Sequence, residues 1–318
     1  MDIGTVAVLG ASGKVGRHVV PLMLERGLTV RALVHRTPVK AEGVQTLSGS
    51  VTDPERCREL VSGADVVVQL ATTKENPDSF FDVSVRGTLN VLEACRGADL
   101  DQLILMGGDA AFGIWFYEQP VPIDENHRRM AYPGYYAFTK VLEEVMVEQY
   151  NIQYGIPYTI LRSSWMFERD DLLRHFSLLE NLDPEEEGHG FGEVDEEIMA
   201  LAEAGEERVA VQVDESGWPY HRHIVHIDDV VQAFGKALGN PTAIGESFNI
   251  AGPAPFDYRE AGEYLSQATN TPTIDIAIPG YHSFEIDINK ARSMLGYRPE
   301  NDIFRMIDRA LQYREHAN

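Results

Sequence analysis

The chain has 318 residues, of which 44% are hydrophobic, so it can bury a large core in one compact unit or in two closely joined lobes. Its formal net charge is −23, from 50 acidic and 27 basic residues, and no strong basic patch interrupts the acidic excess. This charge argues against nucleic acid and anionic membranes as partners, because both would repel the chain. No apolar run approaches the length of a membrane span, so no membrane partner is expected.

The first residues and the cysteines point to the cytoplasm. Residues Val6–Leu9 enter an apolar strand almost at once, without the basic region and the cleavage site of a secretory signal. Cys57 and Cys95 are the only cysteines, and both lie in stretches that are predicted to be helical. We therefore expect no disulfide and a reducing compartment.

Short β-branched runs alternate with amphipathic stretches over the first half of the chain. Strands are expected at 5–9, 29–34, 66–70, 102–106 and 158–162, with a last strand at 247–251 that returns to the same sheet. Helices are expected at 15–26, 53–62, 79–96 and 135–154. The alternation predicts an α/β fold, a Rossmann-like doubly wound parallel sheet.

The segment Gly10–Gly16, GASGKVG, joins the first strand to the first helix. Glycines there permit a tight turn and let the backbone approach a pyrophosphate, which the helix N-terminus attracts. In this position the turn predicts dinucleotide binding. The expected cofactor contacts are Gly10, Ser12, Gly13, Lys14, Val15 and Gly16, with Ala71, Thr72 and Lys74 after the third strand.

The end of the second strand distinguishes NAD from NADP. An NAD site usually carries an acid there, which would repel a 2′-phosphate. This chain instead has His35 and Arg36, and an arginine can contact a phosphate through two N–H groups. We therefore predict NADP as the preferred cofactor, with NAD as the alternative.

The pattern becomes irregular after residue 165, with few strand signals and many acidic, aromatic and proline residues. We predict a dinucleotide-binding domain over 1–165, to which 226–252 returns. A smaller C-terminal substrate-binding lobe is expected from 166–225 and 253–318. Within that lobe, 183–197 holds eight carboxylates and no Lys or Arg, which favours a solvated, partly mobile insertion over a cation site.

Several motifs follow one another along nearly the whole chain. They are Gly10–Gly16, Leu70-Ala71, Gly87–Asn90 (GTLN), Tyr136–Lys140 (YAFTK), Arg222–Asp229 (RHIVHIDD) and Lys290–Pro299. Together they resemble the extended branch of the short-chain dehydrogenase/reductase superfamily, the NAD-dependent epimerase/dehydratase family. The resemblance implies that Tyr136 is the acid/base for the substrate oxygen. It also implies that Lys140, one helical turn later, holds the nicotinamide ribose and lowers the tyrosine pKa, which is ordinarily about 10.

The chain departs from that family where the strand at 102–106 ends. The family carries a Ser or Thr five residues before a glycine, and counting back from Gly113 places Gly108 there. Asp109 falls where sugar-nucleotide dehydratases carry a catalytic aspartate, but the neighbouring threonine and glutamate of that set are absent. Three interpretations remain. A water, a backbone N–H or the hydroxyl of Thr72, Thr73 or Ser163 replaces the missing group; Asp109 serves a different acid/base step; or the protein binds NADP without turning it over.

The substrate side is predicted from Thr73, Gly108, Trp115, Ser163, Trp165 and Arg222. In nucleotide-sugar members of the resembled family, the arginine matching Arg222 contacts the diphosphate, but the second arginine of that site has no clear counterpart here. Strong local acidity also disfavours a dianionic substrate. A free sugar, a sugar acid or another small polyol-like or aromatic carbonyl compound is therefore favoured. Three histidines, at 221, 223 and 226, are candidate metal ligands. Strand-like alternation would place 221 and 223 on one face and 226 on the other, so we predict no metal site.

These features predict an NADP-dependent oxidoreductase or epimerase that acts on a carbinol or carbonyl carbon. The alternatives are a catalytically silent NADP-binding sensor and a nucleotide-sugar epimerase/dehydratase. The resemblance further implies a homodimer, in which helices 79–96 and 135–154 of two copies pair, with Val141, Val145 and Tyr150 as candidate contacts.

Overall fold

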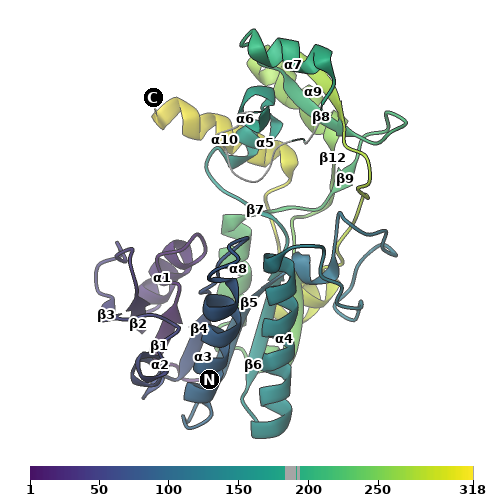
Figure 1. Cartoon of the computed structure of the whole chain (residues 1–318). Coiled ribbons are helices and arrows are strands. Elements are labelled where there is room, and N and C mark those ends of the chain that lie inside the picture. Colours follow the sequence, from purple (N-terminus) through teal and green to yellow (C-terminus); the bar gives the residue numbers. More distant parts are fainter. Residues whose placement is uncertain (183–190, 192–193, 318) are drawn as a thin grey trace.

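A seven-stranded parallel sheet forms the larger part of the protein in the computed structural model, which describes residues 1–182, 191 and 194–317 (Figure 1). The strand order is β11-β6-β5-β4-β1-β2-β3. The strands are β1 (Thr5–Leu9), β2 (Thr29–Val34), β3 (Gln45–Ser48), β4 (Val66–Gln69), β5 (Gln102–Gly108), β6 (Tyr158–Ser163) and β11 (Glu246–Ile250). The predicted Rossmann-like parallel sheet is confirmed, and β3 is an addition to it.

Helices cover both faces of this sheet. They are α1 (Gly16–Glu25), α2 (Pro54–Val61), α3 (Gly87–Cys95), α4 (Tyr135–Tyr154) and α8 (Ile227–Ala237). Helix α1 packs beside α8 on one face, and α3 lies between α2 and α4 on the other. Strand β1 divides its side chains accordingly: Val6 and Val8 enter one hydrophobic core, and Ala7 and Leu9 enter the other. Such two-sided burial explains the nearly continuous apolar runs of the central strands.

Two helix boundaries show how local chemistry sets the chain path. Asp53 caps α2 by accepting a hydrogen bond from the backbone N–H of Glu55 at 2.9 Å, as the Asp-Pro pair predicts. At α8, the acid Asp228 in the first turn suggests a cap, but it is not the capping residue. The cap is His226, whose Nδ1 accepts from the backbone N–H of Asp228 at 3.1 Å.

The expected helix at 79–96 is divided. It begins with a π-helical turn, η1 (Phe81–Arg86), and continues as α3.

The second lobe lies above the sheet domain in Figure 1 and contains the C-terminal end of the described chain. Its helices are α5 (Asp171–Phe176), α6 (Leu178–Leu182), α7 (Glu196–Glu203), α9 (Tyr258–Thr269) and α10 (Ile303–Ala317). Its strands pair across long sequence separations: β8 (Val209–Val213) with β13 (Thr273–Ala277), β9 (His221–Arg222) with β12 (Phe256–Asp257), and β7 (Met166–Phe167) with β10 (Val225–His226).

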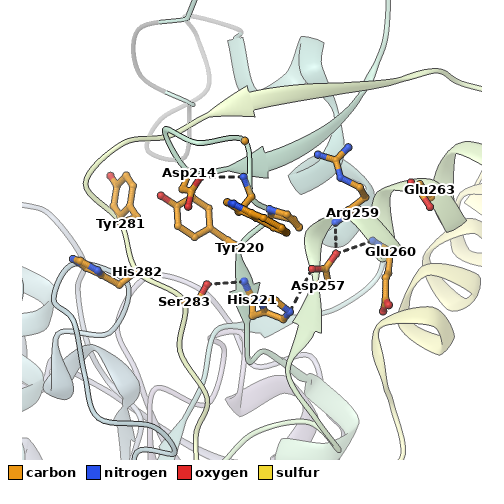
Figure 2. Close-up of a pocket in the computed structure, with 13 residues that line it drawn as sticks. Asp214, Tyr220, His221, Asp257, Arg259, Glu260, Glu263, Tyr281, His282 and Ser283 are labelled. Carbon is orange, nitrogen blue, oxygen red and sulfur yellow. Dashed lines mark hydrogen bonds and ion pairs between the residues drawn. The ribbon is translucent and has the colours of Figure 1, made fainter.

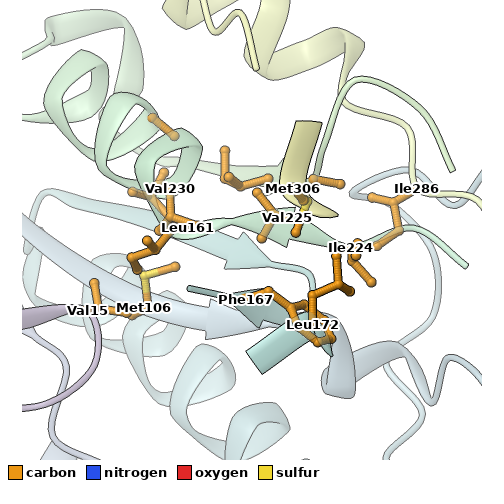
Figure 3. Packing of buried hydrophobic residues seen from close by; sticks show 14 of the residues in the cluster. Val15, Met106, Leu161, Phe167, Leu172, Ile224, Val225, Val230, Ile286 and Met306 are labelled. Carbon is orange, nitrogen blue, oxygen red and sulfur yellow. The ribbon is translucent and has the colours of Figure 1, made fainter. Parts of the chain in front are cut away.

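One hydrophobic core continues from the sheet into this lobe (Figure 3). Met106 and Leu161 of the sheet pack in the same cluster as Phe167, Ile224 and Met306 of the lobe. The lobe therefore rests on the carboxyl ends of the strands through apolar contact.

Both cysteines are buried and free of disulfides. Burial raises the pKa of Cys57 to about 11 and that of Cys95 to about 12, so neither thiol is reactive at neutral pH. No helix in the described ranges is long and apolar enough to cross a membrane. Residues 183–190, 192 and 193, most of the acidic segment, lie outside the described residues.

Candidate active site

A cavity of about 1070 Å³ runs along the carboxyl ends of the parallel strands and reaches under the second lobe. This is the edge at which open α/β sheets bind ligands. Eighteen of the twenty predicted site residues line it: Gly10, Ser12, Gly13, Lys14, Val15, Gly16, His35, Arg36, Ala71, Thr72, Lys74, Asp109, Trp115, Tyr136, Lys140, Ser163, Trp165 and Arg222. Thr73 and Gly108 do not line it.

The glycine-rich turn is packed so tightly against the backbone that Gly10 and Gly16 leave no room for side chains. Gly10 has a φ of 83°, and a Cβ on it would lie 2.8 Å from the backbone nitrogen of Ala71. A Cβ on Gly16 would collide with the carbonyl oxygens of Gly10 and Ala11. The turn therefore keeps the start of α1 open to a pyrophosphate at the place where backbone N–H groups and the helix dipole favour an anion.

Lys14 ties this turn to the second lobe. Its Nζ lies 2.5 Å from Asp171 Oδ2 and donates to the carbonyl oxygen of Met166 at 2.9 Å. In the first turn of α1, His18 Nε2 lies 2.7 Å from Glu168 Oε2, and Arg17 pairs with the same carboxylate. Lys14 thus lines the cavity with its charge already paired.

His35 and Arg36 are exposed at the end of β2 and line the other end of the cavity. Across the described part of the chain, the Arg36 guanidinium makes no hydrogen bond or ion pair. The guanidinium is consequently free to meet a phosphate.

Tyr136 and Lys140 lie one turn apart near the start of α4. Glu75 fixes that start, because its carboxylate accepts from the backbone N–H groups of Tyr135 at 2.7 Å and Tyr136 at 3.2 Å. Lys140 Nζ lies 5.5 Å from the centre of the Tyr136 ring and donates to the carbonyl oxygen of Met106 at 3.1 Å. Burial raises the Tyr136 pKa, and the charge of Lys140 opposes that rise.

Gly108 faces the tyrosine although it does not line the cavity. A Cβ built on Gly108 would lie 3.5 Å from Tyr136 Oη, so the position has room for a side chain. In the parallel register between β5 and β6, Gly108 is paired with Ser163, which is buried and lines the cavity. Paired residues of neighbouring strands project to the same face, so Ser163 stands beside the position where Gly108 has no hydroxyl.

Asp109 lies at the substrate end of the cavity beside Ser164. Ser164 Oγ is 2.9 Å from Asp109 Oδ2 and also within hydrogen-bonding distance of the carbonyl oxygen of His223. A hydroxyl has one proton, so Ser164 donates to only one of these two acceptors at a time. Burial raises the pKa of Asp109 to about 6, although the Ser164 contact and the charge of Arg222 oppose the rise.

Replacing Asp109 is expected to remove a pH-dependent part of the stability. The unfolded carboxyl titrates near ~4 and the folded one near about 6, so the folded protein holds a proton that the unfolded chain loses between these values. The stabilisation is present below about pH 4 and is lost as the pH rises towards about 6.

The free energy of unfolding of the native protein should therefore fall relative to Asp109→Asn over this window, by at most ~3 kcal/mol. Urea unfolding at the two pH values measures the difference. Asp101→Asn, an exposed carboxylate, serves as the control and should change in parallel with the native protein. A constant difference between native and Asp109→Asn would contradict the assignment.

Arg222 is held between two indoles. Its guanidinium carbon lies 4.6 Å from the ring centre of Trp115 and 4.2 Å from that of Trp165. Its Nε is buried and has no partner within the described residues, and its Nη1 lies 3.5 Å from Tyr258 Oη.

Trp115 itself has a φ of 74°, which is costly for a residue other than glycine. Tyr281 stacks on its ring at 5.1 Å, so the indole is buried and lines the cavity at once.

A second cavity of about 880 Å³ lies in the lobe, lined by residues of the β8–β9 connection, α9 and 281–283 (Figure 2). Its main polar groups already have partners. Asp257 caps α9 through the N–H groups of Arg259 and Glu260, and it also lies 3.3 Å from His221 Nε2. The first cavity is the better candidate for chemistry because it holds the acid/base groups.

The three histidines do not form a metal site. His223 is buried between the carbonyl oxygen of Gly252 and the backbone N–H of Ile286, and burial lowers its pKa to about 4. His226 caps α8, and His221 is exposed. Across residues 1–182, 191 and 194–317, no cluster of three His, Cys, Asp or Glu side chains could hold a metal ion.

The structure also brings in residues that the sequence did not single out. Glu75, Tyr132, Ser164, Gln212 and Tyr281 all line the cavity. Ser164 is the one with a usable signal, since it follows Ser163 at the end of a buried strand. The others come from loops and from the second lobe, where no periodic pattern marks them.

Fold and cavity together define a dinucleotide-dependent α/β enzyme. The model of the NAD dependent epimerase/dehydratase family matches residues 6–169, and the chain belongs to that family. It is an NAD(P)-dependent enzyme of the oxidoreductase/epimerase type, as the resemblance implies.

The relatives differ in the reactions that their names give. A putative UDP-glucose 4-epimerase from Methanocaldococcus jannaschii is 25% identical over 98% of this chain and 99% of its own. An L-arabinose 1-dehydrogenase (NAD(P)(+)) from Haloferax volcanii is 29% identical over 52% of this chain and 69% of its own.

Among solved structures, a short-chain dehydrogenase/reductase superfamily protein from Agrobacterium tumefaciens with bound NAD superimposes with a TM-score of 0.86, at 24% identity over 98% of both chains. The UDP-glucuronic acid 4-epimerase from Bacillus cereus in complex with NAD gives 0.75, at 19% identity over 98% of this chain and 99% of its own. These likenesses establish the shared fold.

Proposed function

We propose that this protein is an NADP-dependent oxidoreductase, or an epimerase that works by transient oxidation, acting on a carbinol or carbonyl carbon of a sugar-like or other small molecule. The observation that carries the proposal is the position of Tyr136. Its hydroxyl faces the open side of Gly108, with Lys140 one turn behind, in the cavity that begins at the glycine-rich turn. In this proposal Tyr136 is the acid/base, and Lys140 lowers the tyrosine pKa and binds the nicotinamide ribose.

A bound nicotinamide would supply the hydride acceptor or donor for the carbinol or carbonyl carbon, and Lys140 would hold its ribose. Tyr136 Oη takes the hydroxyl proton of the substrate during oxidation and returns it during reduction. The register of Ser163 beside Gly108 supports Ser163 as the group that replaces the missing hydroxyl. Asp109, whose pKa burial raises to about 6, is a second group that can exchange a proton at the substrate end.

The substrate is proposed to lie between Tyr136 and the Trp115–Arg222–Trp165 sandwich, beneath the lobe of 166–225 and 253–318. The Nε of Arg222 has no partner among the described residues, which supports an anionic or hydroxylated ligand such as a sugar acid. A nucleotide-sugar epimerase is the second candidate, supported by the match to the Methanocaldococcus jannaschii protein over nearly the full length of both chains.

A panel assay tests the proposal. The protein is incubated with NADP⁺ or NADPH and a panel of sugars, sugar acids and carbonyl compounds, and net change in NADPH is followed. Epimerisation consumes no net cofactor, so products are also analysed, and UDP-glucose and UDP-glucuronate are included. No product over the whole panel, together with tight NADP binding, would favour the catalytically silent sensor.

Replacing Arg36 with alanine is expected to weaken NADP roughly ten- to a hundred-fold more than NAD. A charge-assisted bond to a phosphate contributes ~1.5–3 kcal/mol, and NAD lacks the 2′-phosphate. Calorimetric titration of both cofactors measures the two dissociation constants. Arg26→Ala, on the same domain but absent from the cavity lining, is the matched control. Equal losses for both cofactors would show that Arg36 does not discriminate.

We further propose a cytoplasmic homodimer paired through α3 and α4. Large apolar side chains are exposed on these helices and on the turn that precedes α3, which supports the proposal that a second copy covers this face. They are Phe81, Leu89, Phe138, Val145 and Ile152.

A further inference from the structure

Glu143 lies one turn after Lys140 and two turns after Tyr136, on the buried face of α4. It follows that the three side chains share one stripe of the helix. The side chains of Lys140 and Glu143 are 5% and 1% exposed, and neither group lies where water could screen it.

The contacts of this pair are unequal. Lys140 Nζ lies 2.9 Å from Glu143 Oε2. The other carboxylate oxygen, Oε1, is buried and has no hydrogen-bond partner in the described part of the chain. A buried carboxylate with one unsatisfied oxygen costs stability, so this residue is a poor choice for folding alone.

We propose that Glu143 is a positioning residue that offsets the charge of Lys140. It thereby sets the pH above which Tyr136 is deprotonated and can accept a proton from the substrate. The inference rests on the proposed role of Tyr136. Lys140 has three N–H groups, of which Glu143 and the Met106 carbonyl take two. One N–H remains for a ligand, and the charge of the ammonium group is shared with a carboxylate before it acts on the tyrosine.

Other charged groups around Tyr136 and Lys140 do not substitute for Glu143. Glu144, next on α4, is engaged by Arg162 of β6 at 2.9 Å and by Arg129 at 2.9 Å. From the turn before α3, Arg86 pairs with Asp82 at the surface. The other titratable groups that line the cavity include Asp109, Tyr132, Glu75, Lys74 and Arg222. Asp109 and Glu143 both raise the Tyr136 pKa, and Glu143 is the one bound to Lys140.

Glu143→Gln keeps the shape of the side chain and removes the charge. It should lower the pKa of Tyr136 by about one unit, because Lys140 then acts on the tyrosinate without compensation. Glu148→Gln is the matched control: it removes the same charge from the same helix two turns from Lys140, where the carboxylate binds Arg129. That control should leave the pKa of Tyr136 unchanged.

The measurement needs no substrate. The protein is labelled with ¹³C at the ζ carbon of its 13 tyrosines, and the Tyr136 resonance is assigned by its absence in Tyr136→Phe. NMR titrations are run with and without saturating NADP⁺ over the pH range in which the protein stays folded. A downward shift in Glu143→Gln alone supports the proposal, whereas no shift overturns it. An upward shift also overturns it, because Glu143 would then serve to keep Lys140 protonated.

If Glu143→Gln does not fold, Glu143→Ala is titrated in its place. Failure of both variants to fold would assign the carboxylate a structural role and overturn the proposal. Once a substrate is known, the acid limb of the kcat profile should move with the tyrosine pKa. Failure of the proposed function is distinguishable, since it would appear as a fully active Tyr136→Phe whatever the titrations give.

Discussion

Tyr136→Phe is expected to lower turnover by about 10²–10⁴-fold and to leave NADP affinity nearly unchanged. The variant loses only the phenolic oxygen, which faces Gly108 at the inner end of the cavity, while the glycine-rich turn that would hold the pyrophosphate stays intact. Steady-state kinetics on the substrate found by the panel, with calorimetric titration of NADP, measures both effects.

Lys140→Ala gives the contrasting result that makes the test specific. The proposal gives Lys140 two roles, so its loss should reduce both turnover and cofactor affinity. Tyr135→Phe, on the exposed neighbour of Tyr136, is the control and should behave as the native protein. Full activity of Tyr136→Phe would remove the acid/base assignment, and a large loss of NADP affinity in that variant would place the tyrosine at the cofactor instead.

The central sheet could be predicted from the sequence because two-sided burial leaves unbroken apolar runs. Strands β1, β4 and β5 have this character. Strand β3 has the sequence QTLS, is mostly exposed at the sheet edge, and has no apolar alternation to reveal it. The lobe strands β8 and β13 pair across distant segments, and neither half forms a recognisable unit alone.

The candidate site could be predicted where a residue belongs to a motif with fixed geometry. The turn at Gly10–Gly16 and the spacing of Tyr136 and Lys140 are of this kind. The partners of these residues could not be predicted, because they depend on rotamers and on loop paths. Asp109 illustrates this: its position after β5 can be predicted, but its contact with Ser164, which opposes the rise of the Asp109 pKa, requires β6 and the loop at His223 to converge.

Glu143 and Glu144 show the same limit most clearly, since the two acids are adjacent on one helix and chemically identical. Glu143 faces Lys140, whereas Glu144 turns towards the sheet, where Arg162 Nε lies 3.0 Å from both of its oxygens. Sequence periodicity places both near the core but does not distinguish which cation each one meets. We therefore expect Glu143 to adjust the pKa of Tyr136 and Glu144 to stabilise the fold.

Glu144→Ala is expected to destabilise the protein by about 3–5 kcal/mol. Glu144 is 0% exposed and the Arg162 side chain 2%, so the variant leaves a buried guanidinium without its carboxylate. Glu148→Ala removes a carboxylate that is 27% exposed and shares Arg129, and it should cost no more than ~1 kcal/mol.

Urea unfolding of both variants at neutral pH measures the difference between the two losses. The helix that carries Tyr136 and Lys140 is anchored to β6 by this pair, so the destabilised variant should also bind NADP more weakly. A Glu144→Ala variant as stable as Glu148→Ala would show that the Arg162 charge is met by other groups, such as the carbonyl oxygen of Glu125 at 3.0 Å, and that the anchor lies elsewhere.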